Sequence, residues 1–331
     1  MRILSLFDWI ACGYEALQRA WIKIDKYYSS EIDQYAIQIS QKNHPDIVQL
    51  GDINDRESWE LEDIDMIIGG SPCQGFSMAW RMLNFNDPRS ALFFKFVDIL
   101  NHYKPKYRLL ENVKMKGGFR DKISELLGVQ PILIDSARVS AQHRERYYRT
   151  NIQGVEQPED RHIMLKDIII QDGVEEKYYL TETQRNTINR NFWSKGKVLN
   201  NIESLIEKIT FPARINQIDG LDIKCPTLCT AMGTWWGNVP CIAIAYAPSS
   251  REYQQQGRKE DKSPTLKARD YKDPYIVMDG ITIRKLTPIE CERLQTLPDD
   301  YTAWVSNTQR YRALGNWWTV EVIKHIFSYI R

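Results

Sequence analysis

The first 110 residues alternate short apolar runs with stretches whose apolar residues recur at helical spacing. The apolar runs predict strands at 2–7, 26–30, 47–50, 66–69 and 107–110, the last ending at Glu111, and the helical pattern predicts helices at 13–20, 33–43 and 90–101. This β-α-β-α order favours a parallel sheet with helices on both faces. We therefore expect an α/β fold of the Rossmann-like, doubly wound kind.

Polar residues stand just past the carboxyl ends of these predicted strands. They are Asp8, Glu31, Asp52, Cys73 and Glu111. Because ligands of such sheets bind beyond the carboxyl ends of the strands, we expect these side chains to line one edge of the sheet.

The pattern changes after residue 170. Residues 171–304 show weaker periodicity, are richer in Asn, Gln, Thr and Gly, and are divided by prolines, which predicts a smaller, irregular, β-rich domain. Apolar residues return at helical spacing in 319–330 and predict a helix that packs back on the first domain. We expect one domain of residues 1–170 plus 305–331 and a second domain of 171–304.

Composition excludes few classes of protein. Hydrophobic residues make up 43% of the 331-residue chain, and 44 Lys and Arg against 43 Asp and Glu leave a net charge of +1. A nucleic acid would therefore have to bind to local patches of basic residues. The chain holds no apolar run long enough for a membrane span, and its six cysteines are scattered, so we expect a cytoplasmic protein with reduced thiols and no membrane partner. Cys225, Cys229 and Cys241 lack a well-placed fourth ligand, so we expect no metal.

Three short runs carry candidate chemistry. Cys73 lies in the turn Gly-Gly-Ser-Pro-Cys-Gln (69–74), where a thiolate would be an exposed nucleophile, although a lone cysteine is more often a small buried hydrophobe. Glu111 would act as a proton donor at the sheet edge or as a surface carboxylate. Arg144 and Arg146 would share one face of a strand and point into a cleft, or belong to a solvated charge run.

These runs occur in the order found in the cytosine-5 DNA methyltransferases, and the chain resembles that family, in its bacterial and phage type, over nearly its whole length. The matching segments are 7–13 (the cofactor loop, in a Dnmt3-like variant), 31 and 51–52, 72–74, 111–113, 142–146, 284–295 and 314–320. The resemblance implies the S-adenosylmethionine-dependent methyltransferase fold, with a mixed sheet, and a target-recognition domain in 171–304. The residues it implies for binding S-adenosyl-L-methionine are Phe7, Asp8, Ile10, Gly13, Glu31, Asp52, Ile53, Pro72, Asn316 and Thr319.

The resemblance also implies a mechanism on double-stranded DNA. The target cytosine is flipped out of the duplex, and Cys73 adds to its C6 atom. Glu111 contacts N3 and the exocyclic amine, Arg146 holds O2, and Arg144 orients the glutamate. C5 then takes the methyl group, and loss of its proton ejects Cys73. The resemblance implies further substrate contacts by Gln74, Ser77, Gln142, Thr234 and Arg258.

Tryptophan stands at several positions where the family usually has glycine. These positions are Trp9, Trp80, Trp235, Trp236 and Trp317. Glycine tolerates positive φ, whereas tryptophan does so at a cost and adds a large ring. The rings either lie outward from ordinary turns or impair turnover, with Trp9 filling part of the cofactor pocket.

Three functions stay open at this point: an active DNA methyltransferase, a catalytically impaired DNA-binding relative, and an RNA (tRNA) cytosine-5 methyltransferase. The presence of Cys73, Glu111, Arg144 and Arg146 favours an enzyme. The long 171–304 segment favours DNA, because a sequence-reading domain is useful there. A cognate restriction endonuclease is a possible partner, and the target sequence cannot be read from the chain.

Overall fold

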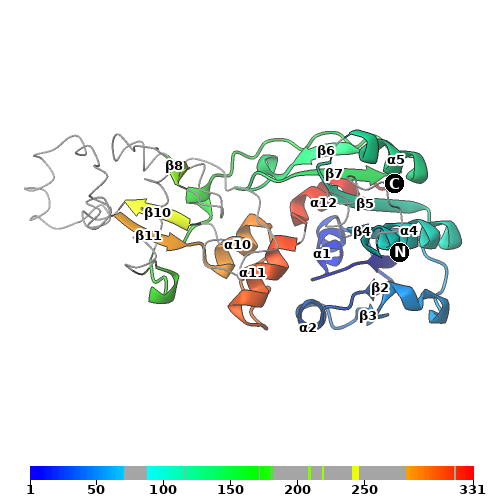
Figure 1. Cartoon of the computed structure of the whole chain (residues 1–331), viewed down its shortest axis with the longest axis horizontal. Helices are drawn as coiled ribbons and strands as arrows, with labels where there is room; N and C mark the ends of the chain where they lie inside the picture. Colours follow the sequence, from blue (N-terminus) through cyan, green and yellow to red (C-terminus); the bar gives the residue numbers. More distant parts are fainter. Residues whose placement is uncertain are drawn as a thin grey trace, which may run out of the picture.

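A seven-stranded sheet forms the centre of the protein (Figure 1). The computed structural model describes residues 1–70, 88–115, 117–170, 172–179, 181, 208–209, 218–219, 241–245, 281–316 and 318–331. The strands of the sheet run in the order β3-β2-β1-β4-β5-β7-β6. Their bounds are β1 (Arg2–Leu6), β2 (Lys26–Ser30), β3 (Val48–Gln49), β4 (Met66–Gly70), β5 (Tyr107–Val113), β6 (Ile132–Asp135) and β7 (Glu145–Thr150).

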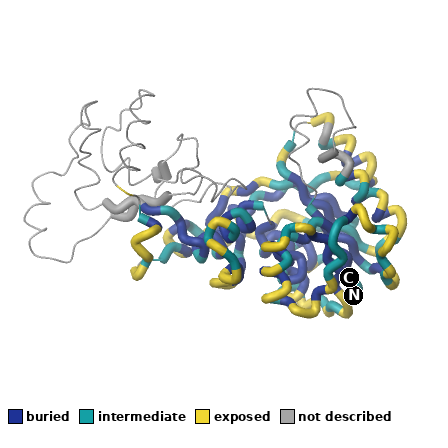
Figure 2. Tube along the Cα trace, turned by 60° about the horizontal axis from the view of Figure 1, so that its bottom comes forward, coloured by how far each residue is buried: buried dark blue, intermediate teal, exposed yellow. Residues whose placement is uncertain are grey.

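Helices cover both faces of this sheet, as the alternating pattern predicts. They are α1 (Cys12–Arg19), α2 (Gln34–Asn43), α4 (Pro88–Tyr103), α5 (Gly117–Leu127), α10 (Pro288–Leu294), α11 (Asn307–Asn316) and α12 (Val320–Phe327). One hydrophobic cluster joins the sheet to α1 and α12, and a second joins it to α4 and α5. Figure 2 shows the result, with buried strands inside and exposed positions outside. The predicted doubly wound α/β class is confirmed.

The sheet is mixed, because β7 enters it in the opposite direction. β7 lies between β5 and β6 and is antiparallel to both, whereas β1 to β5 pair in parallel. Mixed sheets of this kind are common among large α/β sheets. Here the reversed direction brings the segment that carries Arg146 beside the end of β5.

Most predicted elements are present, with their ends displaced by one to three residues. The displacement that matters for the site is at the end of β5, which continues to Val113 instead of ending at Glu111. The predicted helix 33–43 begins one residue later, since Asp33 is its N-cap and accepts hydrogen bonds from the backbone N–H groups of Tyr35 and Ala36.

Most of 171–304 lies outside the described residues. The described strands there are β8 (Lys208–Ile209), β9 (Ile218–Asp219), β10 (Cys241–Ala245) and β11 (Ile281–Lys285); β8 pairs with β9 and β10 with β11, both antiparallel. The division of the chain into two domains stays a prediction. Within the described part of the chain, no helix is long and apolar enough to cross a membrane.

A buried ion pair joins β11 to α10. Arg284 and Glu290 are both fully buried, and two hydrogen bonds of 2.7 and 2.8 Å connect the guanidinium to the carboxylate. The carboxylate also accepts from the backbone N–H groups of Ile170 and Thr287. These bonds compensate the desolvation of both charges and fix the chain at 170 to the start of α10.

We predict that Glu290→Ala lowers the free energy of unfolding by about 3–5 kcal/mol, because it leaves the Arg284 guanidinium charged and buried without its carboxylate. Denaturant melts of the purified protein would measure this loss. Glu62→Ala is the control, since Glu62 pairs with Arg2 and Lys26 at the exposed surface and its removal should leave the midpoint near that of the wild type. Equal effects of the two substitutions would contradict the role of the buried pair.

Candidate active site

Glu111 and Arg146 form an ion pair at the junction of β5 and β7. In the antiparallel register Glu111 lies opposite Tyr148 and Val113 lies opposite Arg146, so Glu111 and Arg146 are diagonal neighbours on one face of the sheet. The Arg146 Nε atom is 2.9 Å from Glu111 Oε1, and only about an eighth of each side chain is exposed, 13% and 12%. This geometry fixes the direction of both charged groups.

The segment before β7 is held by Asp135, the last residue of β6. The Arg144 N–H donates to Asp135 Oδ1 at 2.8 Å, and the Arg144 carbonyl accepts from the Ser136 N–H. Gln142 is fully buried, and its amide has no hydrogen-bond partner among the described residues. Gln142 and Arg144 thus lie directly before the strand whose Arg146 meets Glu111.

The loop between β1 and α1 has an unusual backbone. Phe7, Trp9 and Ala11 take φ angles of 57°, 55° and 60°, in the left-handed region that favours glycine. The Trp9 indole N–H donates to the Ala313 carbonyl at 3.1 Å, and the Arg312 guanidinium lies 5.7 Å from the Trp9 ring centroid. The Trp9 ring is therefore attached to α11 and does not lie free in solvent.

Asp8 belongs to this loop, and its side chain is fully buried. Its Oδ1 accepts from the Tyr27 hydroxyl at 2.7 Å, while Oδ2 has no partner that meets hydrogen-bond geometry among the described residues. Burial raises the pKa of Asp8 above its ordinary value, although the hydroxyls of Ser5, Tyr27 and Ser29 nearby oppose that rise. The carboxyl group is thus poised to take a proton or a polar partner.

Glu31 directly follows β2 and is held by three backbone N–H groups. Oε1 accepts from Ile32 and Asp33, and Oε2 accepts from Trp9 at 2.9 Å. A carboxylate offers about four acceptor positions, so one stays available on Oε2. Burial raises the pKa of Glu31, against the effect of these backbone bonds.

The remaining predicted cofactor residues lie in three places. Asp52 caps the short 3₁₀ turn Ile53–Ser58, accepting from the Asn54 N–H, and Ile53 is buried there. Ile10 and Gly13 are buried in the loop and in α1. Thr319 is fully buried, and its hydroxyl donates to Gln295 Oε1, so this side chain is already satisfied within the protein.

The last turn of α11 connects three parts of the site. The carbonyls of Ala313, Leu314 and Gly315 accept from Trp9 Nε1, Gln295 Nε2 and Arg144 Nη2, at 3.1, 2.6 and 3.4 Å. The final carbonyls of a helix have no partner within the helix, so these side chains satisfy them. Asn316 ends this helix and is partly exposed.

Several predicted residues lie outside the described residues: Pro72, Cys73, Gln74, Ser77, Trp80, Thr234, Trp235, Trp236, Arg258 and Trp317. Asp135 and Gln295 are two polar residues of the site that the sequence reasoning missed. The signal for Asp135 was present, since it ends an apolar run a few residues before the arginine pair.

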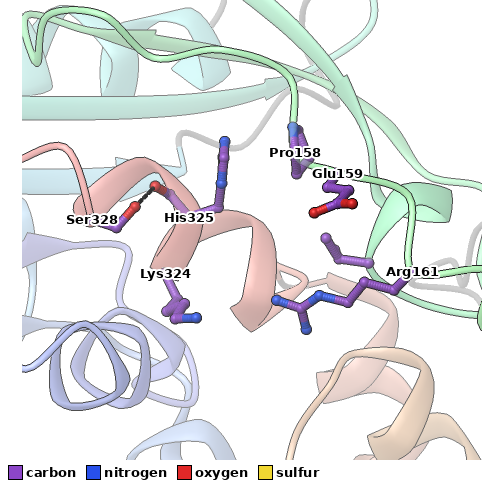
Figure 3. Close-up of a pocket in the computed structure, with 7 residues that line it drawn as sticks. Pro158, Glu159, Arg161, Lys324, His325 and Ser328 are labelled. Carbon is purple, nitrogen blue, oxygen red and sulfur yellow. Dashed lines mark hydrogen bonds between the residues drawn. The ribbon is translucent and has the colours of Figure 1, made fainter.

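Two pockets help to delimit the site. A shallow groove beside the ion pair is lined by Val113, Lys114, Asp135, His143, Glu145 and Arg146. A second pocket lies between α12 and the segment 158–161, where Glu159, Arg161, Lys324 and His325 gather (Figure 3). None of the predicted site residues lines this second pocket, so the groove is the one that adjoins the candidate site.

Comparison with known proteins agrees with this arrangement. The family model of C-5 cytosine-specific DNA methylases matches residues 1–331. The chain is 26% identical to the orphan methyltransferase M.SPRI of Bacillus phage SPR, covering 99% of this chain and 97% of that protein. It is 29% identical to the type II methyltransferase M.NlaX of Neisseria lactamica, covering 98% and 94%.

A solved structure shares the fold as well. A mutant of DNMT2 from Spodoptera frugiperda superposes with a TM-score of 0.66 at 21% identity, covering 99% of this chain and 98% of that one. The strand order and the site geometry come from the described residues, and the family match spans the whole chain. The protein therefore belongs to the family of C-5 cytosine-specific DNA methylases.

Proposed function

We propose that the protein transfers a methyl group from S-adenosyl-L-methionine to C5 of a cytosine in double-stranded DNA. The observation that carries this proposal is the Glu111–Arg146 pair at the sheet corner, next to Arg144 and Gln142. A carboxylate and a guanidinium fixed 2.9 Å apart present an acceptor and donors side by side, which suits the hydrogen-bonding edge of a pyrimidine.

The residues at the strand ends fit the proposed cofactor. The free acceptor position on Glu31 Oε2 suits a ribose hydroxyl, because the three backbone N–H groups already hold the carboxylate in place. Ile53 offers an apolar contact, and Asp8 offers a buried carboxyl oxygen. When bound, S-adenosylmethionine supplies a methyl group on a sulfonium.

The roles of the other groups follow from their positions. Glu111 holds the flipped base through N3 and the exocyclic amine, and Arg146 neutralises charge that develops on the ring at O2. Arg144, tied to Gly315, keeps the arginine segment against α11. Cys73, which lies outside the described residues, adds to C6 and makes C5 a competent nucleophile.

The recognition of DNA is assigned to 171–304, with Thr234 and Arg258 as contacts, and the rest of the chain is assigned to catalysis. The match to the DNA methylase family favours DNA as the substrate. The setting we propose is the cytoplasm, with a restriction endonuclease as a partner, since one relative is named a type II methyltransferase. An RNA substrate and an impaired, DNA-binding protein are the competing outcomes.

A covalent trap separates these outcomes. A DNA duplex pool containing 5-fluorocytosine, incubated with the protein and S-adenosylmethionine, should yield a complex that survives denaturation, because fluorine blocks release of Cys73. Cys73→Ser should yield none, and Glu111→Gln should slow its formation by about 100-fold or more. Trapping of tRNA instead of DNA would support the RNA enzyme, and no trap with either would support the impaired relative.

Removal of the Trp9 ring should strengthen cofactor binding. We expect Trp9→Gly to bind S-adenosylmethionine about tenfold more tightly, equivalent to ~1.4 kcal/mol, because it removes the ring and gives the backbone room to approach the ligand. Isothermal titration calorimetry measures the two dissociation constants. Trp9→Phe is the matched control, since it deletes the indole N–H bond to Ala313 but keeps a ring. Equal affinity of Trp9→Gly and the wild type would reject this hypothesis.

A further inference from the structure

Asp135 holds both ends of the loop that leads to the arginine pair. It ends β6, and it lies opposite Glu145, the first residue of β7. Its Oδ1 accepts from the N–H groups of Ala137 and Arg144, at 3.0 and 2.8 Å, and its Oδ2 lies 3.0 Å from His143 Nδ1. One carboxylate thus closes residues 136–144 into a fixed loop.

The carboxylate is suited to this task because it stays charged. Burial alone would raise the pKa of Asp135, but the bonds from His143, Ala137 and Arg144 outweigh it and hold the pKa below its ordinary value. Hydrogen bonds to an ionised acceptor are roughly twice as strong as neutral ones. The chain therefore enters β7, directly after Arg144, from a position that the Asp135 side chain defines.

This position determines the geometry at Glu111. Arg146 lies opposite Ile134, one residue before Asp135, so the Asp135 bond to Arg144 fixes the register just ahead of the guanidinium that meets Glu111. Release of the Arg144 N–H would let that guanidinium move relative to the carboxylate. A displacement of about 1 Å at a reacting centre can cost about 100-fold in rate.

We propose that Asp135 is a positioning residue for the arginine pair and that it sets the rate of methyl transfer without touching cofactor or base. This inference rests on the proposed function. It assigns Asp135 a role through Arg144 and Arg146, and it assigns His143, whose side chain is 63% exposed, the role of holding the second carboxylate oxygen.

The test compares Asp135→Ala with Asp135→Asn. The alanine variant should lower the single-turnover rate of methyl transfer by about tenfold or more while the dissociation constant for S-adenosylmethionine is unchanged. Asparagine keeps an Oδ1 acceptor for the N–H groups of Ala137 and Arg144, so it should restore the rate to within a few-fold of the wild type. An alanine variant as fast as the wild type, or an asparagine variant as slow as alanine, overturns the proposal.

A second measurement does not depend on activity. Amide hydrogen exchange over 136–146 should speed up in Asp135→Ala and remain slow in Asp135→Asn. Asp160→Ala is the matched control, because Asp160 also accepts a backbone N–H, from His162, and faces that histidine ring, but lies outside the groove. Unchanged exchange in Asp135→Ala contradicts the positioning role, whereas a wild type that neither methylates nor traps DNA contradicts only the proposed function.

A separate observation concerns the tryptophans. Trp21 follows α1. Its φ angle is 59°, and the residue is 95% exposed. Its N–H donates to Gln18 O and the Ile22 N–H donates to Leu17 O, which is the Schellman pattern that ends helices. The residue at this place in the pattern is usually glycine, because the left-handed conformation costs other residues about 1–2 kcal/mol.

Trp9 also has a left-handed backbone, with a φ of 55°. The resemblance to the methyltransferase family places Trp80, Trp235, Trp236 and Trp317 at positions where that family usually has glycine. Independent substitutions would produce a variety of residue types. A single replacement type, tryptophan for glycine, points instead to one codon. UGA differs from the tryptophan codon UGG only in its third base, and different genetic codes read it as stop, tryptophan or glycine.

We infer that the gene encodes positions 9, 21, 80, 235, 236 and 317 with UGA and that its native host reads these codons as glycine. Trp318 differs from them: it is 1% exposed and packed in the core, so it should be encoded by UGG. The native enzyme then has glycine in its cofactor loop and after α1.

The coding sequence tests this directly. UGA at positions 9 and 21 with UGG at 318 is expected, and UGG at 9 and 21 overturns the inference. Trp21→Gly should also raise Tm by about 2 °C or more, through relief of the left-handed strain. Trp59→Gly is the control and should not raise it, since Trp59 has an ordinary φ of −81°. A fall in Tm for Trp21→Gly would count against glycine at that position.

Discussion

The last turn of α11 is the point on which the arrangement of the site depends. A helix leaves its final carbonyls without partners inside the helix, and burying them unpaired is costly. Here the partners come from Trp9 in the first loop, Arg144 before β7 and Gln295 after α10. The requirement to satisfy one helix end thus draws together segments that are some 300 residues apart in the chain.

Close packing of Trp318 adds a second constraint in the same place. A Cβ atom added at Gly70 would lie 3.0 Å from the Trp318 ring nitrogen and 3.3 Å from Glu111 Oε2. One added at Gly13 would lie 2.4 Å from Ile68 Cδ1. Glycine at these two positions lets the indole fill the space between α1, β4 and β5, so the carboxylate of Glu111 is kept in place by packing as well as by Arg146.

The alternation of apolar runs and helical stretches was enough to predict β1 to β5 and the helices around them, since buried strands such as β4 carry runs of apolar residues. The same reasoning missed β6 and did not predict that β7 is antiparallel, because strand direction depends on pairing and leaves no periodicity in the sequence. Glu111, Arg144 and Arg146 were predicted; the structure pairs Glu111 with Arg146 and joins the Arg144 guanidinium to Gly315 of α11. The Asp135 contact could not be predicted, because it depends on a loop closing between residues nine apart.

The antiparallel register also limits how the chain can change. Side chains alternate between the two faces of a strand, so one residue inserted within β7 after Arg146 would leave Arg146 in place but move Tyr148 to the opposite face. One inserted between Glu145 and Arg146 would shift the pairing of Arg146 with β5 and so move its guanidinium away from Glu111. Residues added between α5 and β6 would disturb neither pairing. Length variation among natural relatives should therefore concentrate before β6 and avoid the eleven residues from Asp135 to Glu145.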